Sequence, residues 1–393
     1  MHVHKRQFLT ALGTAVKLAR RDKHDHAAAG LRAEGGDLRV SVAGDAVAID
    51  IPVMATGLFS APAAVQLNPV PLLDFLRRST GTDVDVAITA QQVRVTCAGV
   101  TAQFNCTPDA QPISRPPVTA TGTVGPQALL SALSSVRHAA AARAGQGQAA
   151  YRGVLLEARG SVLQVTATDG HQLAIRAVAW QGDAMRLLVR LSDLWTLMSA
   201  LSLVPGEVTT LQVSEQSLLL DGAVQARVQL MDERAYPDFR TVIPSGHRPN
   251  LHVDADAFRA ALRSVSTILS ADDMVSMRAT PLGLSLHAAT PTARASVPVS
   301  GARVHAPFEV TTRTRMLHLA LLADGELALT AVPGRTTLML TAGPFLALMT
   351  RAAEVQMQVP PPMVPLDGRA PWEAVVASGQ PLPEVTWDAV GRP

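Results

Sequence analysis

A threefold repeat of the same order of elements constrains this chain more than any other feature of its sequence. Each copy begins with an amphipathic helical segment, and the three starts, Arg6, Gln127 and Asp256, lie 121 and 129 residues apart. These segments read RQFLTALGTAVKLARR, QALLSALSSVRHAAAAR and DAFRAALRSVSTILS. Because self-similarity at a fixed spacing marks repeated folding units, the sequence predicts three similar domains in succession.

The rest of each repeat predicts antiparallel sheet with one more helix. Apolar residues fall at every second position after the first helix, which favours a pair of half-buried strands in each of 30–53, 153–178 and 276–299. A second short helix follows at 69–81, 191–202 and 313–325, and further alternating strands close the copies at 83–106, 207–231 and 326–349. Helices and antiparallel strands in this order predict an α+β fold.

Proline-rich joints separate the copies. TPDAQPISRPPVTATGT and AYPDFRTVIPSGHRPN cannot continue a helix or a central strand. We therefore place the domains at 1–120, 121–249 and 250–351. The pattern stops near residue 351, and we interpret the proline-rich segment 352–393 as a flexible tail.

Composition narrows the class of protein. No run of apolar residues is long enough for a membrane helix, and the first residues lack a signal-peptide cleavage site, so we expect a soluble cytoplasmic protein. The two cysteines, Cys97 and Cys106, are too few for a disulfide framework or a structural zinc site, and we expect free buried thiols.

Positive charge is concentrated in the helical segments. They hold fourteen basic residues against five acidic ones, although the whole chain carries only +2. If the helices share one face, that face attracts phosphate; the alternative is that Lys and Arg simply cover solvated helices. The chain has fourteen aromatic residues, too scattered for base stacking. The candidate phosphate-facing residues are Arg20, Arg21, Lys23, Arg77, Arg78, Arg137, Arg143, Arg259, Arg263, Arg313 and Arg315.

Motifs for catalysis or for cofactors are missing from the sequence. There is no phosphate-binding loop, no nucleophile elbow and no zinc helix of the His-Glu-x-x-His type, so we expect no enzyme, cofactor or metal. The histidines in HVH and KHDH are interpreted as surface residues. In TATDGHQLAIR, Asp169 and Gly170 predict a two-residue hairpin turn, because both central positions of such a turn favour positive φ. An Asp-His catalytic pair would need a nucleophile or a metal nearby, and none is suggested.

The repeat, together with RGVLLEARGSVLQVTATDGHQLAIR and AYPDFRTVIP, resembles the bacterial sliding clamps, the beta subunits of DNA polymerase III. The resemblance covers residues 1 to about 350 and is most specific in the central third. It implies a head-to-tail homodimer whose six domains form a ring around duplex DNA, without reading its sequence. It also implies a non-catalytic processivity factor, which tethers replicative and repair polymerases.

The resemblance further implies a hydrophobic cleft between the second and third domains. There the DNA polymerase, the clamp loader and repair proteins would insert a peptide of the Gln-Leu-x-Leu-Phe type. Gln172 and Thr241 stand where the family often has basic residues, and PFLALMTRAAE lacks the proline usual near the family's end. The cleft residues would be Tyr151, Thr168, Gly170, His171, Gln172, Leu173, Pro237, Thr241, Val242, Leu346, Leu348 and Met349.

At the joint between protomers, Phe104 from the first domain would meet Ile268 and Leu269 from the third. All three are apolar, which favours closure of the ring. The departures from the family pattern indicate a divergent paralogue. They leave a second hypothesis open, in which a scaffold with the clamp fold docks partners without being loaded on DNA.

Overall fold

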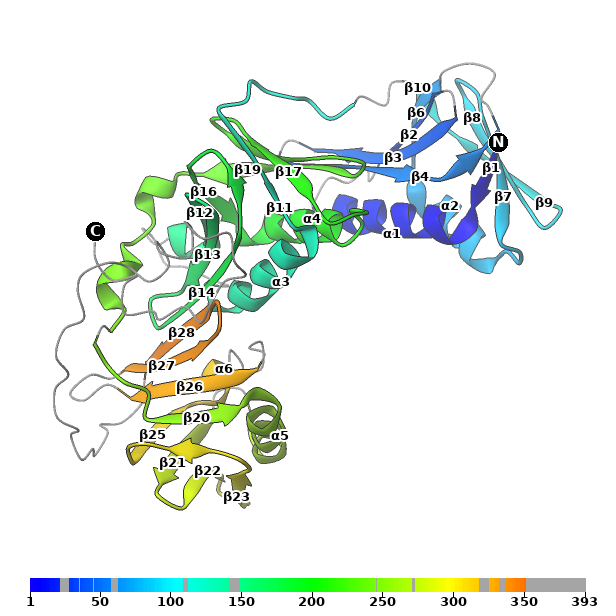
Figure 1. Ribbon diagram of the computed structural model, residues 1–393. Coiled ribbons are helices and arrows are strands. Elements are labelled where there is room, and N and C mark those ends of the chain that lie inside the picture. The colour runs from blue at the N-terminus through cyan, green and yellow to red at the C-terminus, as the bar shows by residue number, and fades with distance from the viewer. Residues whose placement is uncertain are drawn as a thin grey trace. The chain divides into compact units, whose positions relative to one another are not determined.

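The computed structural model describes residues 1–21, 28–34, 36–44, 46–57, 63–108, 112–141, 149–244, 246–270, 273–317, 325–331 and 337–350 (Figure 1). The segment 352–393, predicted to be a tail, and the positions Lys23 and Arg143 lie outside these residues, as do the side chains of Arg20, Arg21 and Arg315. The chain divides into two compact units, one formed by 1–130 with 192–230 and the other by the remaining residues. Within the described part, no helix has the length and apolar character needed to cross a membrane.

The helices form where the periodicity predicts them, but one ends early and another begins late. α3 stops at Val136, and a 3-10 turn, Arg137–Ala139, follows it. Although alanine favours helix, the Ala141 amide donates to the Tyr151 carbonyl at 2.8 Å, so a tertiary contact ends the helix before Arg143. Arg313 lies at the end of a strand and not in a helix, because α6 begins only at Thr314. The helices are α1 Lys5–Arg21, α2 Pro69–Arg78, α3 Pro126–Val136, α4 Leu191–Leu201, α5 Ala255–Ser266 and α6 Thr314–Leu317.

Two antiparallel sheets build the first unit. Among its described residues, one sheet has five strands in the order β5 (Ala55–Thr56), β1 (His2–His4), β7 (Asp83–Ile88), β8 (Gln92–Cys97) and β9 (Val100–Asn105). The other has nine strands, in the order β10 (Thr107–Pro108), β6 (Ala63–Leu67), β2 (Ala29–Glu34), β3 (Asp37–Ala43), β4 (Val47–Val53), β19 (Gln225–Met231), β18 (Ser217–Asp221), β17 (Thr209–Val213) and β11 (Ala120–Val124).

The second unit is built in the same way. Its described residues form a nine-stranded antiparallel sheet with the order β16 (Met185–Arg190), β12 (Gly153–Arg159), β13 (Val162–Thr168), β14 (Gln172–Ala179), β28 (Phe345–Thr350), β27 (Thr337–Ala342), β26 (Glu326–Ala331), β20 (Leu251–Asp254) and β24 (Arg303–Val304). A four-stranded sheet has the order β23 (Arg294–Val299), β22 (Gly283–Ala289), β21 (Met274–Thr280) and β25 (Phe308–Arg313).

Each segment expected to hold a pair of strands holds three. In the central copy these are β12, β13 and β14, because tight turns at both Gly160 and Gly170, which have positive φ, reverse the chain twice. The strand ladders also run across the predicted domain boundaries: β4 pairs with β19, and β14 pairs with β28. The division into three domains stays a prediction, and the two nine-stranded sheets show how closely successive copies are joined.

Apolar faces of the helices cover the sheets, as their periodicity predicts. On α1, Phe8, Leu12 and Ala15 are fully buried, and the helix contacts β2, β3 and β4. On α5, Phe258 and Leu262 are buried in the same way against β22 and β23. These two helices therefore follow the i, i+3, i+4 rule that identified them.

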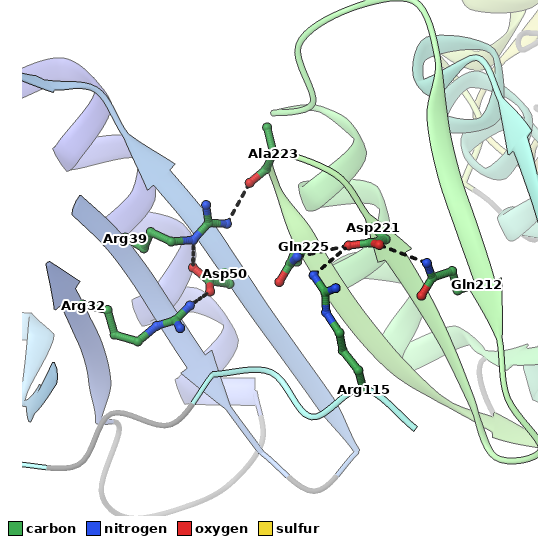
Figure 2. Close-up of polar contacts among 8 residues, drawn as sticks. All are labelled: Arg32, Arg39, Asp50, Arg115, Gln212, Asp221, Ala223 and Gln225. Atoms are coloured by element: carbon green, nitrogen blue, oxygen red, sulfur yellow. Dashed lines mark hydrogen bonds and ion pairs between the residues drawn. The ribbon is translucent and has the colours of Figure 1, made fainter. Parts of the chain in front are cut away.

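A buried carboxylate lies where β4 meets the β18–β19 hairpin. Asp50 has no exposed surface, and its oxygens pair with Arg32 and with Arg39, whose Nε donates at 2.8 Å (Figure 2). Arg39 Nη2 also donates to the Ala223 carbonyl at 2.8 Å. Arg39 thus links β3 to a loop from a segment far along the chain.

The first proline-rich joint is fastened to the same sheet. Ile113 is buried against Ala48 and Leu219, and Arg115 donates to Asp221 at 3.1 Å (Figure 2). Gln212 and Gln225 complete the hydrogen bonds to that carboxylate. This part of the joint is therefore packed and not a free linker.

The cysteines are free, as expected, but only one is fully buried. Cys97 is 1% exposed and its Sγ donates to the Thr80 carbonyl at 2.9 Å. Cys106 is half-buried, so the expectation of two buried thiols is wrong for this residue, which follows the edge strand β9.

Candidate functional site

The turn that joins β13 to β14 has three residues, not the predicted two. Of its residues only Gly170 has a positive φ, at +87°. Asp169 Oδ1 accepts hydrogen bonds from the amides of His171 and Gln172, at 2.8 and 2.9 Å. The Asp side chain thus closes the turn by capping its backbone, which is why the Asp-Gly pair does not adopt the two-residue geometry.

An apolar cluster lies behind this turn, on one face of the second unit's large sheet. The register pairs Leu173 with Leu348 and Ile175 with Leu346, so β14 and β28 bring these side chains to the same face. Each is less than 5% exposed. The complete cluster is Ala150, Leu155, Leu173, Ile175, Leu188, Tyr236, Phe239, Ile243, Met339, Leu346 and Leu348.

The structure brings together three of the predicted cleft residues in this cluster, namely Leu173, Leu346 and Leu348. Thr168 lies opposite Leu173 and is 7% exposed. A β-carbon placed on Gly170 would lie 3.9 Å from the Tyr151 ring, so this half-buried tyrosine lies beside the turn.

Other predicted cleft residues lie at the surface. His171 and Thr241 are exposed, Val242 is 53% exposed and Pro237 is half-buried. We define the rim as Tyr151, Gly170, His171, Pro237, Thr241 and Val242.

Two of the expected residues lie on the opposite face of the sheet from the cluster. Gln172 and Met349 are partners in the ladder, one position out of phase with Leu173 and Leu348. Met349 is fully buried there, and Gln172 Nε2 donates to the His138 carbonyl and to Asp169 at 3.1 Å. Because side chains alternate between the two faces of a strand, the sequence of β28 could have predicted that Met349 faces away from Leu346 and Leu348.

Sequence reasoning missed several side chains of the cluster. Tyr236, Phe239 and Ile243 come from the segment 236–243, where spacings of three and four place them on one side of two 3-10 turns. The two rings lie edge to face, with centroids 6.5 Å apart. Burial raises the pKa of Tyr236 far above its usual range, so this hydroxyl stays protonated and donates to the Thr166 carbonyl at 3.4 Å.

A buried ion cluster fastens this segment to the sheet. Glu157 on β12 is 4% exposed, and Arg240 Nη2 donates to its Oε2 at 2.5 Å. Burial by itself would raise the pKa of Glu157, but the hydrogen bond from Arg240 and the charges of Arg240, Arg159 and Arg186 more than offset it, and the pKa lies below the usual value. Arg240 also lies 4.9 Å from the centre of the Phe239 ring.

Of the basic residues expected to meet phosphate, some are exposed and others form ion pairs. Arg78, Arg137 and Arg263 are exposed, as is Arg313 on its strand. Arg77 pairs with Asp74 at 3.6 Å, and Arg259, with 15% of its side chain exposed, pairs with Asp256 at 2.5 Å. Whether these residues share one face stays a prediction.

The positions expected at the protomer joint lie on or near edge strands of the small sheets, one sheet in each unit. Phe104 is half-buried on the edge strand β9, and its ring centroid lies 6.0 Å from that of Phe75. Ile268 and Leu269 are half-buried just after α5. Across the described residues, no three His, Cys, Asp or Glu side chains gather in a group that could hold a metal ion.

Comparison with known proteins gives partial matches in sequence, to the beta sliding clamps of two strains of Caulobacter vibrioides. No protein-family model matches the chain. The beta sliding clamp of Caulobacter vibrioides is 32% identical over 108 residues, which make up 27% of this chain and 29% of the relative. The chain therefore matches less than a third of the length of this curated relative.

Similarity in structure extends over most of the chain. A DnaN sliding clamp, the DNA polymerase III subunit beta of Pseudomonas aeruginosa, matches with a TM-score of 0.78 and 16% identity, over 90% of this chain and 99% of that one. The beta subunit of Thermotoga maritima matches with a TM-score of 0.75 and 15% identity, over 90% and 98%. The beta sliding clamp of Caulobacter crescentus matches with 0.74 and 19%, also over 90% and 98%. The chain therefore has the α+β fold of the bacterial sliding clamps, as the resemblance in its sequence motifs implied.

Proposed function

We propose that this chain is a DNA polymerase processivity factor, a sliding clamp that encircles duplex DNA and tethers replicative and repair polymerases. The observation that carries the proposal is the similarity in fold to sliding clamps over 90% of the chain. In this role the protein acts in the cytoplasm by topology and docking, and it catalyses no reaction.

The edges of the two small sheets support a ring made of two chains. Among the described residues, β9 is an edge strand of a five-stranded sheet and β23 is an edge strand of a four-stranded one. Joined between two copies, these edges would give a sheet of nine strands, the size of each large sheet inside the chain. Unpaired edges are prone to such addition, and Phe104, Ile268 and Leu269 would supply apolar contacts.

Contact with DNA would rest on charge alone. The exposed arginines of the helices are suited to phosphate, and binding of this kind is independent of sequence.

The rim and the apolar cluster would form the docking face for partner proteins. The DNA polymerase, the clamp loader and repair proteins would each present a peptide of the Gln-Leu-x-Leu-Phe type. Because Leu173, Leu346 and Leu348 are nearly buried, a peptide would first meet Tyr151 and the exposed Val242.

The first test is the mass in solution. Light scattering over a range of concentrations should give a mass near twice 41.3 kDa that persists on dilution. A monomer at every concentration would contradict the ring and would favour a scaffold that docks partners without encircling DNA.

The second test is topological retention. A linear duplex fixed to a bead at one end allows a closed ring to thread over the free end, which is then blocked with a bulky protein. We expect the blocked duplex to retain the clamp through a high-salt wash and to release it when a restriction enzyme cuts the DNA. Loss in the wash, whether or not the end is blocked, would show that binding is only electrostatic.

A further inference from the structure

A row of charged side chains runs beside the apolar cluster on the same face of the sheet. Glu157 lies two residues beyond Leu155 on β12, and Arg186 lies two residues before Leu188 on β16. The register pairs Glu157 with Arg186 and Leu155 with Leu188. Side chains two residues apart on a strand share a face and are separated by about 7 Å, so the charged row directly borders the apolar row.

Three arginines, Arg159, Arg186 and Arg240, surround the single carboxylate of Glu157, so positive charge exceeds negative charge here. Both oxygens of Glu157 are already bound, Oε1 by Arg159 and Oε2 by Arg240, each at 2.5 Å. Arg186 Nη1 lies 3.8 Å from Oε1, which is within ion-pair range but too far for a hydrogen bond. The exposed Asp238, next to Arg240, uses its carboxylate to cap the Arg240 amide.

Arg186 therefore keeps its hydrogen-bonding capacity. Its side chain is 36% exposed, and that of Arg159 is 61% exposed. A guanidinium beside a carboxylate whose two oxygens already have other arginine partners can still bind a second carboxylate with two parallel hydrogen bonds.

We propose that Arg186, assisted by Arg159, binds an Asp or Glu side chain of the docked peptide, so that the partners of this protein carry acidic residues next to their apolar anchors. This inference rests on the proposed docking function. It identifies Arg186 as a residue that determines specificity, and Glu157 as the residue that holds the neighbouring arginines in place.

Fluorescence anisotropy with three labelled peptides tests the inference on the full chain. All three share a Gln-Leu-Ser-Leu-Phe core, with neutral flanks, an acidic flank before the core or an acidic flank after it. We expect one acidic peptide to bind about fivefold more tightly than the neutral one. The gain should shrink between about 0.1 M and about 1 M salt, where the Debye length falls from about 10 Å to about 3 Å.

Arg186→Gln should remove this gain and leave the affinity for the neutral peptide unchanged, because Arg186 makes no hydrogen bond to Glu157. Arg176→Gln is the matched control: Arg176 lies on β14 of the same sheet, one residue out of phase with the cluster residue Ile175, and the gain should persist in this variant.

Three results would overturn the inference in distinguishable ways. If the neutral peptide binds and neither acidic peptide binds more tightly, the inference fails and the proposed docking function stands. If the gain persists in Arg186→Gln, the acidic flank binds elsewhere. If no peptide binds the unaltered protein, the docking function fails together with the inference.

Discussion

Asp50 has a carboxylate without exposed surface in the first unit. It is fully buried, and its pairing with Arg32 and Arg39 joins three positions of one sheet (Figure 2). A buried ion pair adds little over an apolar replacement, but removal of one partner leaves charge without compensation.

Asp50→Ala should lower the free energy of unfolding by about 3 kcal/mol. This loss is at the low end of the range for breaking a buried ion pair, about 3 to 5 kcal/mol. The side chains of Arg32 and Arg39 are 24% and 26% exposed, so water can partly hydrate them after Asp50 is removed. Urea unfolding followed by circular dichroism measures the loss. Asp37→Ala, at an exposed position on β3, is the control and should change stability by less than about 0.5 kcal/mol.

Glu157 should make stability depend on pH in a defined direction. Its pKa in the folded state lies below the ordinary value of about 4.3, so its stabilising contribution is complete above that pH and is lost as the pH falls through the lowered pKa. The difference in unfolding free energy between the unaltered protein and Glu157→Gln should therefore be constant from about pH 8 to about pH 5 and shrink below about pH 4. A difference that grows on acidification would contradict the assignment.

At the scale of elements, the turn between β13 and β14 decides the shape of the candidate docking face. Asp169 accepts from two backbone amides and from Gln172 Nε2, and Thr168 Oγ1 donates to the Gln172 carbonyl at 2.7 Å. These bonds fix where β14 begins, and with it which side chains of that strand face the cluster.

Asp169→Ala should loosen this turn without unfolding the sheet. We expect a stability loss of about 1 kcal/mol, together with faster hydrogen exchange at the amides of residues 170–172 and weaker binding of the core peptide. Asp238→Ala, which removes a comparable cap at Arg240, is a useful comparison because it should leave exchange in the turn unchanged. Unaltered exchange at 170–172 in Asp169→Ala would show that the backbone holds the turn without the carboxylate.

At the scale of the whole molecule, the proposed ring depends on apolar contacts at two separate places on the chain. Phe104 lies on β9, and Ile268 follows α5, which packs on β23. A head-to-tail joint buries both positions at once, so a charge at either one should open it.

Phe104→Asp and Ile268→Asp should each shift the mass in solution from twice 41.3 kDa to that of a single chain. Leu282→Asp is the control, because Leu282 is 99% exposed in the single chain and lies outside the proposed joint. Circular dichroism would confirm that the variants remain folded. A dimer that survives both substitutions would place the joint elsewhere.

Local patterns in the sequence predicted where the helices and strands lie, although each segment expected to hold two strands holds three. The spacing of Phe8, Leu12 and Ala15 marks the buried face of α1, and alternation marks Leu173, Leu346 and Leu348 as residues that face one way. Such patterns depend only on residues a few positions apart in the sequence, so they can be recognised without knowledge of the fold.

Only the tertiary structure decided which elements meet. The pairing of β14 with β28 joins residues that lie 169 to 177 positions apart in the sequence, from Arg176 with Phe345 to Gln172 with Met349. It sets Met349 on the face away from Leu348 and the cluster. The contacts of Tyr236 and Phe239 with that sheet also come from separate segments, as do Arg186 and Arg240 beside Glu157. The sequence by itself determined the repeat and the apolar faces; the partners of those faces followed from long-range packing, because periodicity reports that a face is buried and not what covers it.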